Sequence, residues 1–224
     1  MSGKPIKNSD QNKAWFKKTS QNEPYSIDTV VTKKPLLIVC EGSNTEVKYF
    51  ESIPASQINV KIIGGCGSKT ALIKKALKLS QQEQYKGREI WCVYDMDFKG
   101  DQIGQKEDFN NSIKKAKSKG IKVAYSNDAF ELWFVLHYKR IEQAFLRFQY
   151  YDMLSTLWGI NYEKQGKELQ FSKSLYDRLL NDNRANQALA IERAKTLLKE
   201  HKDKTYSERN PCTTVFELIE LLLL

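Results

Sequence analysis

Two short apolar runs in the first half of the chain end abruptly in acidic residues. The stretch 90–97, IWCVYDMD, stops being apolar at Asp95, and a second carboxylate follows at Asp97. The run LLIVC, which follows Pro35, ends in the same way at Glu41. Continuous apolar runs rich in β-branched and aromatic residues are typical of strands buried on both faces of a sheet. The pattern therefore predicts two buried strands, each of which delivers carboxylates to an edge of the sheet.

The segments around these runs alternate between strand-like and helix-like patterns. Two further apolar runs, 59–63 and 121–126, predict strands. Apolar residues at helical spacing predict helices over 43–53, 71–82 and 106–119. Alternation of this kind predicts a largely parallel sheet flanked by helices, with right-handed crossovers. Because the carboxyl ends of parallel strands meet at one edge, we expect the strand-end acids to share one rim.

The second half of the chain has a different pattern. The segment 129–138, AFELWFVLHY, is apolar nearly all round, which predicts a helix packed between layers. From Glu142 to the end, apolar residues recur at helical spacing. We therefore expect an α/β protein with three parts: a basic, flexible N-terminal arm (1–34), an α/β core (35–140) and a helical C-terminal portion (141–224) that packs on the core.

Composition narrows the class of partner. The 224 residues carry a formal net charge of +9, and the pI is about 9.2. A basic balance of this size favours a polyanion such as nucleic acid, although charge alone does not separate RNA from DNA or from an acidic protein. The longest apolar runs are far shorter than the roughly 20 residues needed to span a bilayer. The first 34 residues also lack the apolar core of a signal peptide, so we predict a cytoplasmic protein without membrane contact.

The acids at the expected strand ends are candidate metal ligands. Residues two apart on an extended segment point the same way, so Asp95 and Asp97 could share one hard cation through their oxygens. Glu41 would bind the same cation or act as a general base. The alternative is a structural role, in which one aspartate caps the following helix and its neighbour is solvated.

Other polar residues lie near the same expected edge. Glu46 falls in the first turn of a predicted helix, where the dipole favours a carboxylate and backbone amides could receive a phosphate; acids there are also common for stability alone. Lys69 follows the glycine-rich sequence GGCGS and could meet a substrate phosphate, although the loop lacks P-loop spacing. An aromatic group around Arg147 could stack bases, but such a stripe is more often core.

Two polar residues lie in or beside the apolar segment 129–138. Glu131 is a carboxylate within it, and burying an unpaired charge costs several kcal/mol, so we expect it to meet a metal or an arginine. His137 lies six residues further on, where a lone histidine is either a substrate contact or a satisfied structural residue. The four cysteines lie singly, without the CxxC spacing of a zinc site.

Four separated motifs together resemble the RloB family. They are EGSNTE at 41–46, DMD at 95–97, SNDAFELWFVLHY at 126–138 and NPCTTVFEL at 210–218. The resemblance runs from about Leu36 to the C-terminus. Two positions depart from the family pattern: Asp128 stands where the family usually has proline, and Cys212 where it usually has a small hydroxyl residue.

The RloB family is in turn similar to the Toprim superfamily, in which a glutamate after one strand and a DxD pair after another surround Mg²⁺ or Mn²⁺. The resemblance implies a Toprim-like core with Glu41, Asp95 and Asp97 as metal ligands. It also implies that Glu131 belongs to the catalytic set. Substrate contacts would come from the residues Glu46, Lys69, Asn127 and His137.

The resemblance also implies a biological setting. RloB-like proteins resemble effectors of bacterial defence against phage, often found with an ATPase of the ABC or AAA type, and related Toprim-like effectors include nucleases that cut tRNA. We therefore expect a metal-dependent nuclease that acts on RNA such as tRNA rather than on DNA. The alternative is a non-catalytic Toprim-like subunit that interacts with or regulates a defence ATPase. The leucines at the C-terminus could also form the interface of a homo-oligomer. The chain is short for a topoisomerase and has no primase zinc ribbon.

Overall fold

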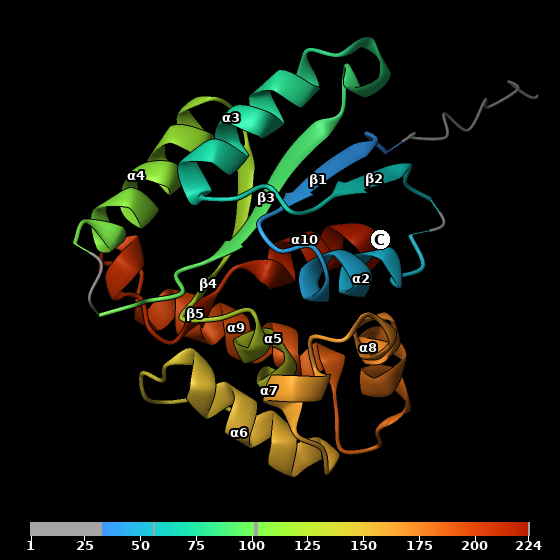
Figure 1. The fold of residues 1–224 in the computed structure, drawn as a ribbon, viewed down its shortest axis with the longest axis vertical. Coiled ribbons are helices and arrows are strands. Elements are labelled where there is room, and N and C mark those ends of the chain that lie inside the picture. The colour runs from blue at the N-terminus through green and yellow to red at the C-terminus, as the bar shows by residue number, and fades with distance from the viewer. Residues whose placement is uncertain (1–32, 56, 101–102, 224) are drawn as a thin grey trace, which may run out of the picture. The chain divides into compact units, whose positions relative to one another are not determined.

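A five-stranded, mostly parallel sheet organises the part of the chain that the structure describes (Figure 1). The computed structural model describes residues 33–55, 57–100 and 103–223. Within them the strand order is β2-β1-β3-β4-β5, and only β5 runs antiparallel to its neighbour. The strands are β1 (Leu36–Cys40), β2 (Val60–Ile63), β3 (Glu89–Asp95), β4 (Lys122–Asn127) and β5 (Cys212–Thr213).

The helices follow the order that the apolar spacing predicts in the first half of the chain. Between the parallel strands lie α2 (Thr45–Glu51), α3 (Lys69–Ser80), the short 3-10 helix η2 (Glu83–Tyr85) and α4 (Gln105–Ser118). After β4 come α5 (Glu131–Leu136), α6 (Arg147–Trp158), α7 (Tyr162–Gln165), α8 (Leu169–Asn181), α9 (Gln187–Glu200), the 3-10 helix η3 (Tyr206–Glu208) and α10 (Val215–Leu223). The α/β class, the mostly parallel sheet and the helical C-terminal portion are therefore confirmed.

The sheet is buried on both faces, as its continuous apolar strands predict. Along β1, Leu37 and Val39 join a core with α3 and α4, whereas Leu36, Ile38 and Cys40 join the core on the other face. That second core includes α2, α5 and the apolar faces of α6 and α8–α10. In Figure 1, α3 and α4 cover one side of the sheet while α2 and α10 lie on the other. The C-terminal helices thus share one continuous core with β1 and β3.

Residues 210–214 interrupt the helices of the C-terminal portion. There the chain forms β5 and pairs with β4, with Ser126 opposite Thr213. Thr214 donates its backbone N–H to the Tyr125 carbonyl (2.9 Å), and its hydroxyl accepts from the Tyr125 N–H (3.0 Å). Pairing satisfies the exposed edge of β4, a requirement that helical periodicity in this segment does not reveal.

The described residues test only some of the expectations about domain boundaries, cysteines and membrane contact. The predicted N-terminal arm, residues 1–34, lies outside the described residues except for Lys33 and Lys34. The domain boundaries at 34 and 140 stay predictions. All four cysteine thiols are buried and free. Within 33–223, apart from residues 56, 101 and 102, no helix is long and apolar enough to cross a membrane.

Candidate active site

The loop after β1 places two carboxylates beside β3. Glu41 donates its backbone N–H to the Val93 carbonyl (2.9 Å), which continues the pairing of β1 with β3 for one residue. Gly42 follows, and a side chain there would collide with the Glu46 carboxylate. The glycine of the EGSNTE motif therefore lets the Glu46 carboxylate lie directly against the loop that carries Glu41.

The two aspartates of the DMD motif share one cation, and that cation is an arginine. Asp95 is the last residue of β3 and is 6% exposed. Asp97 lies beyond the strand with a φ of 44°, so the extended geometry assumed from the sequence has already ended. Arg147 places Nη2 3.2 Å from Oδ2 of Asp95 and Nη1 2.9 Å from Oδ1 of Asp97. In the described residues the cation that both aspartates contact is this guanidinium, and the shared Mg²⁺ or Mn²⁺ stays a prediction.

Asp128 fixes the position of this arginine. Its Oδ2 accepts the backbone N–H of Arg147 (2.9 Å) at the start of α6, and its Oδ1 accepts the backbone N–H of Phe98 (2.7 Å). The Asp128 carbonyl also accepts the backbone N–H of Asp97 (2.9 Å). One carboxylate, at a position where the family usually has proline, thus ties the loop after β3 to the first residue of α6.

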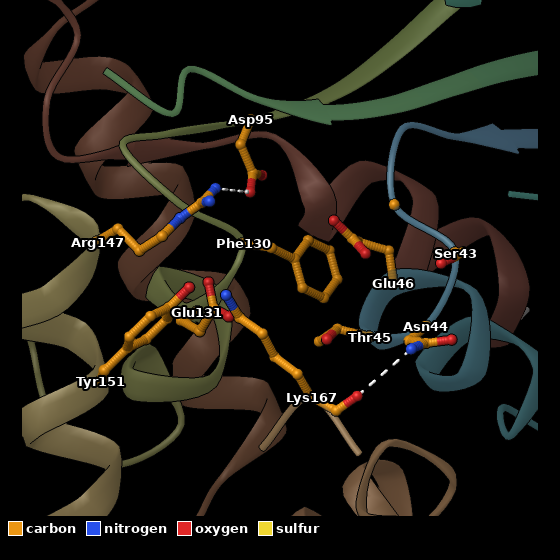
Figure 2. Close-up of a pocket in the computed structure, with 11 residues that line it drawn as sticks. Ser43, Asn44, Thr45, Glu46, Asp95, Phe130, Glu131, Arg147, Tyr151 and Lys167 are labelled. Carbon is orange, nitrogen blue, oxygen red and sulfur yellow. Dashed lines mark hydrogen bonds and ion pairs between the residues drawn. The ribbon is translucent and has the colours of Figure 1, made fainter. Parts of the chain in front are cut away.

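Asp95, Glu46 and Glu131 line one pocket of about 220 Å³, together with Arg147 and Lys167 (Figure 2). Glu131 begins α5, is 5% exposed, and its Oε1 accepts the hydroxyl of Tyr162 (3.2 Å). In Figure 2 the Lys167 side chain extends toward Glu131, while Arg147 reaches Asp95 from the opposite wall. We refer to this cavity as the carboxylate pocket.

Burial and mutual repulsion raise the pKa values of these acids. Burial raises the pKa of the Asp95 carboxyl well above its usual value, the Glu46 carboxylate adds to the effect, and the Arg147 guanidinium opposes it. Burial likewise raises the pKa of Glu46 to about 7, with Glu131 and Glu41 contributing and Arg147 opposing. The pKa of Glu131 is raised by burial against the opposing charge of Arg147. The pocket therefore favours the protonated form of these acids more than water does.

Glu41 and Asp97 face a second, neighbouring cavity of about 300 Å³. It is lined by Lys69 and Lys99 among others. Lys69 is buried, and its Nζ lies 3.7 Å from Oε1 of Glu41, while Nζ of Lys99 lies 3.7 Å from Oδ2 of Asp97. Burial raises the pKa of Glu41, and Lys69 opposes that shift. The predicted acids are thus brought to one edge of the sheet but divided between two cavities.

Two of the proposed substrate contacts lie elsewhere. Asn127 is 2% exposed and donates its side-chain amide to the carbonyls of Tyr206 (3.4 Å) and Ser207 (3.0 Å). His137 is also 2% exposed, its Nδ1 lies 2.9 Å from the Trp133 carbonyl, and burial lowers its pKa to about 4. Neither lines the carboxylate pocket or the cavity that Glu41 and Asp97 face. Their contacts favour structural roles, and substrate contact by either stays a prediction.

Sequence reasoning missed the residues that organise the pocket from the second half of the chain. Arg147 was noted only as part of an aromatic group, of which Tyr150, Tyr151 and Trp158 are indeed buried. Lys167 and Asp128 carried no expected role in the site. The one local signal was Arg147 itself, a cation at the start of a largely apolar helical stretch that has to meet negative charge when buried.

The donor chemistry of this edge fits Mg²⁺ or Mn²⁺, since both cations prefer carboxylate oxygens. Oδ1 of Asp95 is buried and has no hydrogen-bond partner among the described residues, so it is free to meet a ligand. However, in the described part of the chain no group of three or more His, Cys, Asp or Glu side chains is arranged to hold a metal ion. Arg147 instead neutralises Asp95 and Asp97.

Comparison with known proteins identifies the family. Residues 36–222 match the model of a family described as RloB-like protein, which confirms the resemblance carried by the four motifs. The chain is also 30% identical over 125 residues to a glutamate--tRNA ligase of Limosilactobacillus reuteri subsp. reuteri (strain JCM 1112), across 53% of this chain and 23% of the ligase. Because the chain spans under a quarter of that relative's length, this match assigns it no activity. The family match covers most of the chain, which therefore belongs to the RloB-like protein family.

Proposed function

We propose that this protein is a metal-dependent nuclease that hydrolyses phosphodiester bonds in nucleic acid, with RNA such as tRNA favoured over DNA. The observation that carries the proposal is the buried Asp95 carboxylate, whose Oδ1 lacks a partner in the described part of the chain while Glu46 and Glu131 line the same pocket. Uncompensated buried charge is costly, so a cluster of this kind favours a cationic ligand. The net charge of +9 favours a polyanionic substrate.

Glu41, Asp95 and Asp97 would hold Mg²⁺ or Mn²⁺, and Glu41 is also the candidate general base. The bound cation would orient the attacking water and neutralise charge that builds on the phosphate. Lys69, beside Glu41, would hold a flanking phosphate of the strand. Arg147, whose guanidinium already contacts both aspartates, would stabilise negative charge on the scissile phosphate, as bidentate guanidinium groups do.

We propose bacterial defence against phage as the setting of this activity, with an ATPase of the ABC or AAA type as partner; membership of the RloB-like family supports this proposal. The matched ligase acts on tRNA by its name, but the match covers 23% of it and supplies no reaction for this chain. A defence nuclease has to stay inactive until it is triggered. Metal binding is therefore measured together with cleavage.

The test compares wild type with Asp95→Asn, which keeps the shape of the side chain but removes its charge. Calorimetry with Mg²⁺ and Mn²⁺, and cleavage of end-labelled tRNA and DNA, are the two measurements. We expect metal binding to disappear and cleavage to fall by roughly 100-fold or more in Asp95→Asn. Asp152→Asn on the exposed side of α6 is the matched control and should behave as wild type. An Asp95→Asn protein that cleaves at the wild-type rate would remove Asp95 from the mechanism.

A second candidate function is a non-catalytic subunit that interacts with or regulates a defence ATPase. The observation that favours it is the ion pairing of Arg147 with both Asp95 and Asp97, which neutralises them without a metal. This function predicts that a well-folded wild type binds neither Mg²⁺ nor Mn²⁺, even with nucleic acid present. It also predicts that binding of the ATPase partner survives Asp95→Asn and chelation of metal.

A further inference from the structure

A larger cavity lies away from the acids, where the end of α4 and the start of β4 meet η3 and α10. Its volume is about 560 Å³, and it shares no lining residue with the carboxylate pocket. Small-molecule sites commonly have volumes of roughly 300–1,000 Å³. The cavity is therefore large enough for a ligand of nucleotide size. We refer to it as the basic cavity.

Three cations line the basic cavity, and Glu217 is the one carboxylate that lines it with them. Lys122 is already paired, since its Nζ lies 3.0 Å from Oε1 of Glu89. Lys117 and Arg209 form no ion pair with a carboxylate of the described residues. Their charges are therefore available to an anion that enters the cavity.

Both of these cations contact the same aromatic ring. The Arg209 guanidinium carbon lies 4.7 Å from the centroid of the Tyr206 ring, and Lys117 Nζ lies 5.0 Å from it. Arg209 is held in place because Nε and Nη2 donate to the carbonyls of Lys204 (2.9 Å) and Lys202 (2.7 Å). The Tyr206 ring also packs edge-on against Tyr125, with centroids 5.8 Å apart. The cavity thus combines a positioned aromatic ring with fixed positive charge.

We propose that the basic cavity is a binding site for a nucleotide, with the base against Tyr206 and the apolar side chains of Ile121 and Leu198, and the phosphate beside Lys117 and Arg209. A nucleotide is the ligand class that needs both surfaces at once, because its base stacks on aromatic groups and its phosphate pairs with cations. A free mononucleotide and one nucleotide of a single strand share this chemistry. The site is separate from the acids and does not depend on the proposed hydrolysis.

The test titrates the full chain, in EDTA to keep metal from the acids, with AMP, UMP and a short single-stranded RNA. Lys117→Gln should weaken binding roughly tenfold, the loss expected for one charge-assisted contact. Lys114→Gln is the matched control, since Lys114 is exposed on the same helix but does not line the cavity. Glu217→Gln should strengthen binding severalfold because it removes the repelling carboxylate. Arg209 is not substituted, because it also holds the loop at residues 202–204.

Each outcome decides the proposal. Mononucleotide binding that falls in Lys117→Gln and rises in Glu217→Gln assigns the cavity to a free nucleotide. Binding of the RNA alone, with the same response to the two substitutions, assigns it to one nucleotide of a strand. Absence of binding by all three probes overturns the proposal, as does an equal loss in Lys117→Gln and Lys114→Gln. Because cleavage is not measured, these results are independent of whether the protein is a nuclease.

Discussion

The carboxylate pocket and the basic cavity carry opposite charge, and they hold that charge in different ways. In the first, Asp95 and Glu131 are 6% and 5% exposed, so their charge has been taken out of water. In the second, Lys117, Lys122 and Glu217 are exposed. Buried charge affects folding itself, whereas exposed charge mainly affects binding. Substitutions in the two sites should therefore separate stability from ligand affinity.

The largest effect is expected at Arg147. Arg147→Met keeps much of the volume but leaves the buried Asp95 carboxylate without its partner, so the free energy of unfolding at pH 7 should fall by about 3 kcal/mol. Urea unfolding without metal measures it. Adding Asp95→Asn to Arg147→Met should restore most of the loss, because the unpaired charge is then absent.

The control for this prediction is Arg140→Met. Arg140 forms an exposed ion pair with Glu200, at 2.7 Å between Nη2 and Oε1. Exposed pairs contribute little, so its unfolding free energy should change by less than about 1 kcal/mol. Equal losses in the Arg140 and Arg147 variants would show that burial does not distinguish the two pairs.

A smaller effect, with a definite pH dependence, is expected at Glu46. Its pKa is raised to about 7 in the folded protein from an ordinary value of 4.5. Between these values the folded state binds more protons than the unfolded state, so this group lowers stability as pH rises from about 4.5 to 7. Glu46→Gln should remove that trend and gain about 1 kcal/mol at pH 8, after allowance for solvent screening.

Unfolding in urea at pH 5 and pH 8, in EDTA, checks the prediction for Glu46. Glu163→Gln, at an exposed position in the first turn of α7, serves as the control and should keep the wild-type pH dependence. A Glu46→Gln protein whose stability falls with pH as steeply as that of wild type would contradict the assignment of the trend to Glu46.

The smallest stability effect is expected in the basic cavity. Lys117→Gln and Glu217→Gln change exposed side chains, so each should alter the free energy of unfolding by less than about 0.5 kcal/mol. The same urea unfolding experiment applies. Losses above about 2 kcal/mol would show that these residues support the fold, and the contrast between the two sites would then disappear.

Much of the fold follows from local pattern. The apolar runs that end at Glu41 and Asp95 are β1 and β3, and the helical spacings between the strands correspond to α2, α3 and α4. β5 was not predicted, because a two-residue strand has no periodicity of its own and exists only through its pairing with β4. The Toprim-like character of the core and the bound metal stay predictions.

Only the acids from the first half of the chain could be predicted as part of the candidate site. The acids of the first half follow buried strands, so parallel topology brings Glu41, Asp95 and Asp97 to one edge. Their division between two cavities was not predictable, since it depends on where the chain turns after β3 and on where Arg147 enters. The basic cavity was not predicted at all, because its lining residues come from α4, β4, α9, η3, α10 and the loops beside them, each with an unremarkable local sequence.

The amino-acid sequence by itself determined the order of buried strands, the acids that end them and the basic balance of the chain, because each depends on residue type and short-range spacing. Only the tertiary structure decided that the cation shared by Asp95 and Asp97 is Arg147, which lies 52 residues after Asp95. The physical reason is that charge pairing depends on distance in space. A carboxylate buried at a strand end needs a partner, but the packing of α6 against α5 selects which residue that partner is.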